Sequence, residues 1–161
     1  MKTVFKPFLS VLTVLLLLAA VLTGCTVTTT PGSPSGGTTN AASAGKLDKN
    51  GTYTSKDDVA LYLHTYGELP QNYITKKQAE RLGWDGGSLE PYAPGKCLGG
   101  NYFGNYEGHL PKKKGRTYYE CDIDTLGKRS RGPKRLVYST DGLIYYTPDH
   151  YETFELLYGE E

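Results

Sequence analysis

The stretch Arg135-Leu-Val-Tyr-Ser-Thr-Asp-Gly-Leu-Ile-Tyr-Tyr-Thr-Pro-Asp-His-Tyr-Glu-Thr-Phe154 decides the fold. Its segments 136–138 and 143–146 are rich in branched and aromatic side chains, which favour a pleated strand. Asp141-Gly142 between them supplies the positive φ that a tight turn needs. We therefore predict a β-hairpin, followed at Pro148 by an irregular segment in which a rigid sheet holds His150. A histidine in such a segment can act as a proton donor near neutral pH.

Two helices are predicted before the strands. Ser55 is a good N-cap, acidic residues follow it, and Gly67 ends the first helical pattern. Thr75 begins a second helix, and Gln78 three residues later completes a capping box. In this second helix Ala79 and Leu82 are expected to face inward, and the helix is expected to close just beyond, at residue 83.

Segments with strand character begin at residue 97 and cover 97–103, 117–124, 136–139, 143–147 and 154–158. Helices first and strands afterwards are typical of the α+β class. We therefore predict N-terminal helices packed on a C-terminal antiparallel β-sheet of about five strands.

The first residues form a targeting segment. Residues 1–24 combine two lysines with an apolar core from 8 to 22, the pattern of a secretion signal. The Leu-Thr-Gly-Cys sequence ending at Cys25 resembles a bacterial lipoprotein cleavage box, in which that cysteine becomes lipidated; the alternative is an ordinary signal peptide. Residues 26–45 carry no charge and predict a flexible tether. Residues 46–161 are then one small folded domain, secreted and tethered to the bacterial membrane by its lipid alone.

The charge excludes a protein that is basic throughout. Without Lys2 and Lys6, the 18 basic residues become 16 against 17 acidic ones, a net charge of −1. The charge is unevenly distributed, because residues 112–135 hold nine basic and three acidic side chains. Such a segment can attract phosphate, although a run of charge is more often a solvated loop.

Residues 117–124 carry the most informative alternation. Glu120 and Asp122 lie on one face of the predicted strand, and Cys121 lies on the other. Two carboxylates on one side of a central strand are costly unless cations face them. Arg131 and Arg135 follow in the chain and can return over that face.

Taken in order, several further motifs match one family. They are Leu69-Pro70, Asn72-Tyr73-Ile74-Thr75-Lys76, Leu82-Gly83-Trp84, Ala93-Pro94-Gly95-Lys96 with Gly99-Gly100, Glu107-Gly108, Leu110-Pro111, Gly115-Arg116-Thr117, Leu143-Ile144-Tyr145, Asp149-His150-Tyr151 and Thr153-Phe154. From about residue 59 to residue 154, the chain resembles the barnase family of bacterial guanine-preferring ribonucleases, which has the microbial ribonuclease fold.

The resemblance implies an endoribonuclease with RNA as its substrate. Glu120 would be the general base that takes the proton of the ribose 2′-hydroxyl, and His150 the general acid that protonates the leaving 5′-oxygen. Lys76, Arg131 and Arg135 would stabilise the charge on the phosphate. The product would be a 2′,3′-cyclic phosphate that is then hydrolysed. The resemblance implies no metal and no cofactor, and DNA would not be cleaved because it lacks the 2′-hydroxyl.

Guanine selection in the family comes from the loop that matches residues 103–107. Glu107 would accept hydrogen bonds from the guanine N1 and N2 donors, and backbone amides around Asn105 would bind O6. Phe103 and Tyr151 would pack against the base. Arg116 with Asp141, and Asp122 with the two arginines, resemble structural ion pairs.

The sequence departs from the family pattern at several positions. Tyr106 stands where the family usually has an arginine, Asn101 where it has an acid, and Gly142 where it has a tryptophan. One extra residue lies between Asp122 and Arg131. Cys97 and Cys121 have no counterpart in the disulfide-free members. They fall on strands expected to be neighbours, so we expect a disulfide, the alternative being two buried free thiols.

Two other functions stay open from the sequence. One is a tethered RNA-binding module without catalysis, and the other is a ribonuclease toxin with a cognate inhibitor. If the protein is a ribonuclease, with or without a toxin role, the resemblance implies a monomer. It also implies a small acidic barstar-like inhibitor protein as a second partner. His64 and His109 are given no role.

Overall fold

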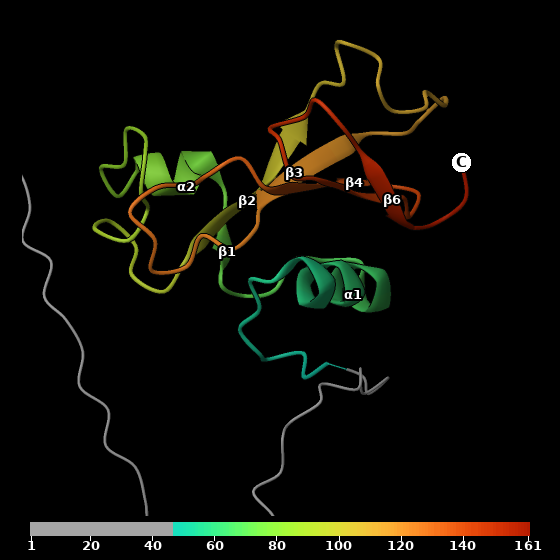
Figure 1. The fold of residues 1–161 in the computed structure, drawn as a ribbon. Helices are drawn as coiled ribbons and strands as arrows, with labels where there is room; N and C mark the ends of the chain where they lie inside the picture. Colours follow the sequence, from blue (N-terminus) through green and yellow to red (C-terminus); the bar gives the residue numbers. More distant parts are fainter. Residues whose placement is uncertain (1–46) are drawn as a thin grey trace, which may run out of the picture. The chain divides into compact units, whose positions relative to one another are not determined.

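The structure, a computed structural model, describes residues 47–161 (Figure 1). The predicted signal peptide (1–24), the lipidation site Cys25 and the predicted tether (26–45) lie outside the described residues. Among the residues that are described, no helix is both long enough and apolar enough to cross a membrane.

Helix α1 (Lys56–Tyr66) begins and ends where the sequence predicts. Ser55 Oγ accepts a hydrogen bond from the Asp58 backbone N–H at 3.2 Å, which satisfies one free donor of the first turn. Gly67 adopts the left-handed conformation (φ 69°) and donates its N–H to the Leu63 carbonyl at 2.8 Å. The N-cap and the C-terminal glycine therefore fix both ends of this helix.

Helix α2 (Lys76–Glu80) is shorter than predicted. The capping box is present: Thr75 Oγ1 accepts from the Gln78 N–H at 3.2 Å, and Gln78 Oε1 accepts from the Thr75 N–H at 2.8 Å. After Glu80 the chain continues in turns, so Leu82 leaves the helical spacing and is 55% exposed. The prediction that Leu82 faces inward is wrong for this reason.

The sheet has the antiparallel strands that the sequence predicts and one additional strand. Strand order follows chain order, and only the first pair is parallel. The additional strand is the two-residue β1, which the sequence pattern is too short to reveal. The strands are β1 (Tyr73–Ile74), β2 (Cys97–Phe103), β3 (Tyr118–Asp122), β4 (Arg135–Ser139), β5 (Ile144–Thr147) and β6 (Glu155–Tyr158).

The two faces of the sheet pack against different partners. Val59, Ala60 and Leu63 of α1 pack against one face, together with side chains of β3, β4 and β5, and Figure 1 shows α1 lying along this face. Because side chains alternate along a strand, the neighbouring residues Val137 and Tyr145 belong to the opposite face and to another core cluster. The second face carries the site described below.

The register between β2 and β3 leaves the predicted disulfide unformed. Gly100 has a positive φ of 80°, and the register between β2 and β3 shifts there. As a result Cys121 lies opposite Gly99, whereas Cys97 pairs with Tyr73 of β1. Diagonal neighbours two positions apart are about 7–8 Å apart, beyond the reach of a disulfide. Cys97 and Cys121 are buried free thiols, the alternative that the sequence left open.

Candidate active site

Glu120 is the buried carboxylate at the centre of the site. It lies on β3, opposite Asn101 of β2 and Val137 of β4, and is 6% exposed. Its Oε1 atom accepts a hydrogen bond from Lys76 Nζ at 2.6 Å. Its Oε2 atom accepts a hydrogen bond from the Tyr151 hydroxyl. Both carboxylate oxygens are therefore held, which keeps a buried charge at a fixed place.

Asn101 connects the sheet to the lysine. Its side-chain oxygen accepts the backbone N–H of Lys76 at 2.9 Å, at the first residue of α2. Asn101 is also the β2 neighbour of Glu120. The amide thus fixes the start of α2 directly beside the carboxylate that the lysine contacts.

Asp122 is the second carboxylate on this face, and two arginines bind it. Arg131 donates from Nε at 2.7 Å to Oδ2 and from Nη2 at 2.8 Å to Oδ1, a bidentate pair. This hydrogen bonding raises the pKa of Arg131. Arg135 Nε lies 3.0 Å from Asp122 Oδ1, but this buried nitrogen has no well-oriented hydrogen bond, so the contact is ionic.

The segment after β5 places His150 and Tyr151 in unusual backbone conformations. Their φ angles are +62° and +79°, a region that costs about 1–3 kcal/mol for residues other than glycine. The His150 N–H donates to the Pro133 carbonyl at 3.2 Å, and the Tyr151 N–H donates to Thr147 Oγ1 at 2.8 Å. These contacts hold an exposed imidazole ring beside the ring of Tyr151, 4.7 Å away between centroids.

Asp149 organises this segment, a role that the sequence interpretation missed. Its Oδ1 atom accepts the N–H groups of Glu152 (3.1 Å) and Thr153 (2.9 Å). Hydrogen bonds from Thr153 are the main reason why the pKa of Asp149 is lowered. The signal was available, since an Asp after Pro148 is typical of a side chain that caps its own turn.

The predicted guanine-binding loop is closed by Asn105. This residue is buried with a positive φ of 45°, its Nδ2 donates to the Leu110 carbonyl at 2.8 Å, and its Oδ1 accepts the Leu110 N–H at 3.0 Å. Both polar atoms of the Asn105 side chain are thus hydrogen-bonded within the protein. Glu107 and Tyr106 are exposed on this loop, Tyr106 by 85%.

A cleft of about 530 Å³ brings most of the predicted residues together. Six of them line it: Phe103, Asn105, Glu107, Glu120, His150 and Tyr151. The Phe103 and Tyr151 rings lie 5.1 Å apart between centroids and form an aromatic wall. The three predicted phosphate ligands do not line this cleft; Lys76 adjoins it through Glu120, and the two arginines are bound to Asp122.

Besides the role of Asp149, one contact of the site was not foreseen from the sequence. The Tyr151 hydroxyl binds Glu120, whereas the sequence suggested only packing of its ring. Burial, and then this hydrogen bond, raises the pKa of Tyr151, so the hydroxyl stays a donor. Within the described residues no group of three or more His, Cys, Asp and Glu side chains is arranged to hold a metal ion.

Comparison with known proteins gives a consistent result. A family model described as ribonuclease matches residues 40–158. A ribonuclease of Heyndrickxia coagulans is 54% identical over 100 residues, which cover 61% of this chain and 91% of the relative. A ribonuclease of Bacillus intermedius is also 54% identical over 100 residues, which cover 61% of each protein.

More distant relatives carry more specific names. Guanyl-specific ribonuclease St of Saccharopolyspora erythraea is 40% identical over 57 residues, 35% of this chain and 56% of the relative. Among solved structures, ribonuclease Sa2 with guanosine-2′-cyclophosphate is 42% identical, with a TM-score of 0.30, over 35% of this chain and 60% of that one.

Proposed function

Since the chain belongs to the ribonuclease family, we propose that it cleaves single-stranded RNA after guanosine, with Glu120 as general base and His150 as general acid. The observation that carries the proposal is that both side chains line one cleft, with the carboxylate held at both oxygens. An in-line displacement at phosphorus needs a base and an acid on opposite sides of the phosphate.

In the first step Glu120 takes the proton of the 2′-hydroxyl. The 2′-oxygen attacks the adjacent phosphorus, and the bond from phosphorus to the 5′-oxygen of the next nucleotide breaks. The Lys76 ammonium group, 2.6 Å from Oε1, fixes the position of the carboxylate that takes the proton. The nucleophile belongs to the substrate and is already in place, so positioning supplies much of the rate enhancement.

His150 completes this step by donating a proton to the leaving 5′-oxygen. Its ring is exposed in the cleft, so it can reach a bound substrate, while its backbone is anchored to Pro133 and to the turn that Asp149 organises. The product is a 2′,3′-cyclic phosphate. In the second step His150 takes a proton from water as the water oxygen attacks phosphorus. The bond from phosphorus to the 2′-oxygen breaks, and Glu120 returns a proton to that oxygen, which leaves a 3′-phosphate.

Lys76, Arg131 and Arg135 are the proposed source of positive charge at the phosphate. Arg131 and Arg135 share the single charge of Asp122, which leaves net positive charge next to Glu120. Fixed cations of this kind stabilise negative charge that grows on phosphoryl oxygens in the transition state. We propose that the reaction needs no added metal.

Guanine selection is assigned to the closed loop. Glu107 is an exposed carboxylate in the cleft and forms no ion pair among residues 47–161, so it is free to accept hydrogen bonds from guanine N1 and N2. Because the Asn105 side chain is occupied, backbone N–H groups near it are the groups available for O6. Phe103 and Tyr151 supply the aromatic wall for the base.

The test is an oligoribonucleotide with a single guanosine, incubated with the purified protein in EDTA. The product ends are identified by mass, and a matched all-deoxy strand is the control. The proposal predicts one cut after the guanosine, with a 2′,3′-cyclic phosphate, and no cut in the deoxy strand. Binding without cleavage would contradict the proposed cleavage and favour the RNA-binding module. Cleavage at every base would contradict the proposal that Glu107 selects guanine.

We also propose that the enzyme acts outside the cell, attached through a lipid on Cys25. The proposal rests on the sequence of residues 1–25, which has the pattern of a lipoprotein signal. A lipid on Cys25 would anchor the protein through methylene groups buried in the membrane. Cys25→Ser should move the protein from the membrane fraction to the medium or block its processing. An unchanged membrane fraction would refute the lipid anchor.

A further inference from the structure

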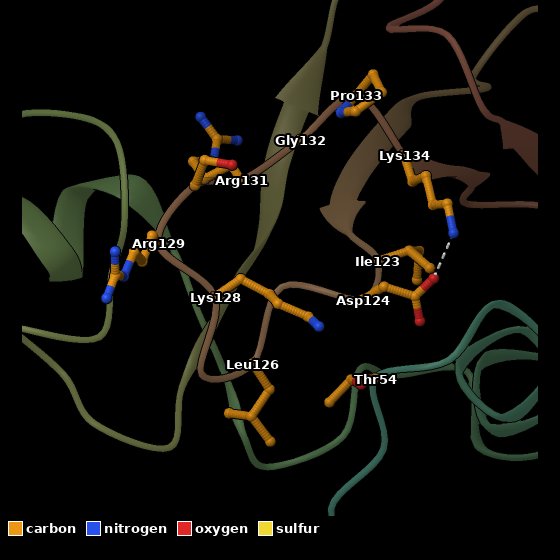
Figure 2. A pocket seen from close by; sticks show the side chains of 11 residues that line it. Thr54, Ile123, Asp124, Leu126, Lys128, Arg129, Arg131, Gly132, Pro133 and Lys134 are labelled. Carbon is orange, nitrogen blue, oxygen red and sulfur yellow. Dashed lines mark hydrogen bonds and ion pairs between the residues drawn. The ribbon is translucent and has the colours of Figure 1, made fainter. Parts of the chain in front are cut away.

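Two hollows outside the catalytic cleft differ in their chemistry. One lies beside the loop that joins β3 to β4, and Figure 2 shows basic side chains around it, with Lys134 bound to Asp124. The other, of about 370 Å³, lies between the end of α1 and the turn that joins β4 to β5. None of the described residues that line this second hollow is Lys, Arg, Asp or Glu. We call it the hairpin pocket, and its lining includes Leu63, Gly67, Tyr119, Tyr138, Gly142 and Ile144.

Two glycines leave the hairpin pocket open at its rim. Gly67 ends α1 and Gly142 lies in the turn, with φ angles of 69° and 98°. A Cβ atom added at either position would meet no atom within 4 Å beyond its own chain neighbours. Backbone therefore borders the pocket at both places, and a ligand can approach it closely.

Two tyrosines of the sheet supply the aromatic part of the pocket. Tyr119 of β3 and Tyr138 of β4 lie directly opposite each other, and their ring centroids are 5.9 Å apart. Leu63 of α1 and Ile144 of β5 add aliphatic surface. The rings of tyrosine residues attract flat aromatic rings and also cations. The pocket therefore favours a ligand that contains an aromatic ring.

The C-terminal end of α1 gives the pocket a polar side. Gly67 donates its N–H to the Leu63 carbonyl, whereas the carbonyls of His64 and Thr65 accept no backbone hydrogen bond within residues 47–161. The free carbonyls at such a helix end carry partial negative charge, about half an elementary charge in total. This side of the pocket therefore favours a cation and disfavours an anion.

We propose that the hairpin pocket binds a small aromatic amine, with its ring on Tyr119 and Tyr138 and its ammonium group at the end of α1. The pocket volume of about 370 Å³ lies in the range of small-ligand sites. Tyr138 packs against the core cluster that α1 forms with the sheet, so the pocket lies on the face of the sheet opposite Glu120. The proposal is therefore independent of the proposed reaction.

The test is a titration of the isotope-labelled protein with two ligands at about pH 8, above the usual titration range of histidine. The ligands are tryptamine and tryptophol, which share the indole ring and the two-carbon chain but end in an ammonium group and a hydroxyl, respectively. Amide signals in NMR spectra report both the affinity and the place of binding. We expect tryptamine to shift the signals of Gly67 and Gly142, with a dissociation constant on the order of 1 mM or lower. Tryptophol should bind about fivefold more weakly, because it lacks the charge that the helix end attracts.

A pair of tyrosine variants tests the aromatic contact. Tyr119→Leu removes one ring and keeps an apolar side chain, so it should weaken the binding of tryptamine by about tenfold. The matched control is Tyr106→Leu, which changes a tyrosine that is 85% exposed and lines the catalytic cleft. This control should keep the affinity of the wild-type protein.

A pair of histidine variants tests the charge and does not alter the sheet. His64 is exposed in the last turn of α1 and lines the pocket. His64→Lys places a fixed cation there and should weaken the binding of tryptamine by about fivefold, with no effect on tryptophol. His64→Gln is the neutral control and should bind tryptamine as the wild-type protein does. This pair decides the question even if Tyr119→Leu fails to fold.

Three results would overturn the site: no shift of the Gly67 and Gly142 signals with tryptamine, equal affinity for the two ligands, or unchanged affinity in His64→Lys. Shifts within residues 103–107, together with weaker binding to Tyr106→Leu, would place the ligand in the catalytic cleft and would also refute the proposal.

Discussion

The two faces of β3 differ in what they do for the molecule. Cys121 on one face is buried against α1 and the apolar side chains of β4 and β5, and burial raises its pKa well above the usual thiol value. Glu120 and Asp122 on the other face are as deeply buried but charged, and each is held by cations. The comparison teaches that one strand can serve stability through one face and chemistry through the other, because side chains alternate.

The charged face itself contains two different arrangements. Asp122 is saturated by two arginines, so its role is to fix them. Glu120 contacts one lysine and one hydroxyl and also lines the cleft. We therefore expect loss of Asp122 to act on stability first and on catalysis only through the two arginines, whereas loss of the groups around the cleft acts on catalysis directly.

The largest expected effect is on the catalytic side. His150→Ala should lower kcat/KM on GpU by about 10²–10⁴-fold, the range for loss of a general acid. Since the ring is exposed, the free energy of unfolding should change by less than about 0.5 kcal/mol. A guanosine 3′-phosphate ester of 4-nitrophenol needs no protonation of its leaving group, so the variant should cleave it with a much smaller loss. An equal loss on both substrates would remove the general-acid role.

The next effect belongs to the buried charge. Asp122→Ala leaves Arg135, which is 2% exposed, without its acid, and should destabilise the fold by about 3–5 kcal/mol in urea unfolding. The control is Asp124→Asn, which removes the charge of an exposed pair with Lys134, keeps a side chain that tolerates the positive φ of 59° at this residue, and should cost less than about 1 kcal/mol. Similar costs for the two variants would contradict the distinction between buried and exposed pairs.

On the apolar face, Leu63→Ala should cost about 2–5 kcal/mol of stability, because it leaves a cavity between α1 and the sheet. At a temperature where the variant is still folded, its kcat/KM on GpU should match that of the wild-type protein. A large loss of activity in folded protein would show that the two faces of β3 are coupled.

The smallest effect is at the hairpin. Arg116 and Ser139 donate hydrogen bonds to Asp141 and lower its pKa. The unfolded state then binds more protons at acidic pH, so the stability from this pair is present above the usual Asp pKa of about 3.9 and is lost as pH falls below it. The stability difference between the wild-type protein and Asp141→Asn should therefore shrink between about pH 5 and pH 2. A constant difference over that range would mean that the carboxylate charge contributes nothing.

The sequence was most informative where local chemistry decides the structure. The N-cap Ser55, the capping box of Thr75 and the Asp141-Gly142 turn act within a few residues, and each is present as predicted. The alternation along β3 predicted that both carboxylates share a face and that arginines return over it.

The sequence was least informative where the outcome depends on register. Cys121 lies opposite Gly99, two positions from Cys97, and sequence patterns do not specify this register. The contact between Tyr151 and Glu120 likewise joins residues far apart in the chain through a positive φ that sequence patterns do not encode for tyrosine. Such contacts form only when the strands have assembled into the sheet, so local sequence patterns do not predict them.

The most direct test of the central claim is to measure kcat/KM on GpU and the free energy of unfolding together for Glu120→Gln. The side chain keeps its size, so the fold should retain its stability within about 1 kcal/mol, because the partner Lys76 is partly exposed. The account predicts a loss of about 10²–10⁴-fold in kcat/KM, as for removal of a general base. Near-normal activity in a stable variant would contradict the claim that this face of β3 carries the chemistry.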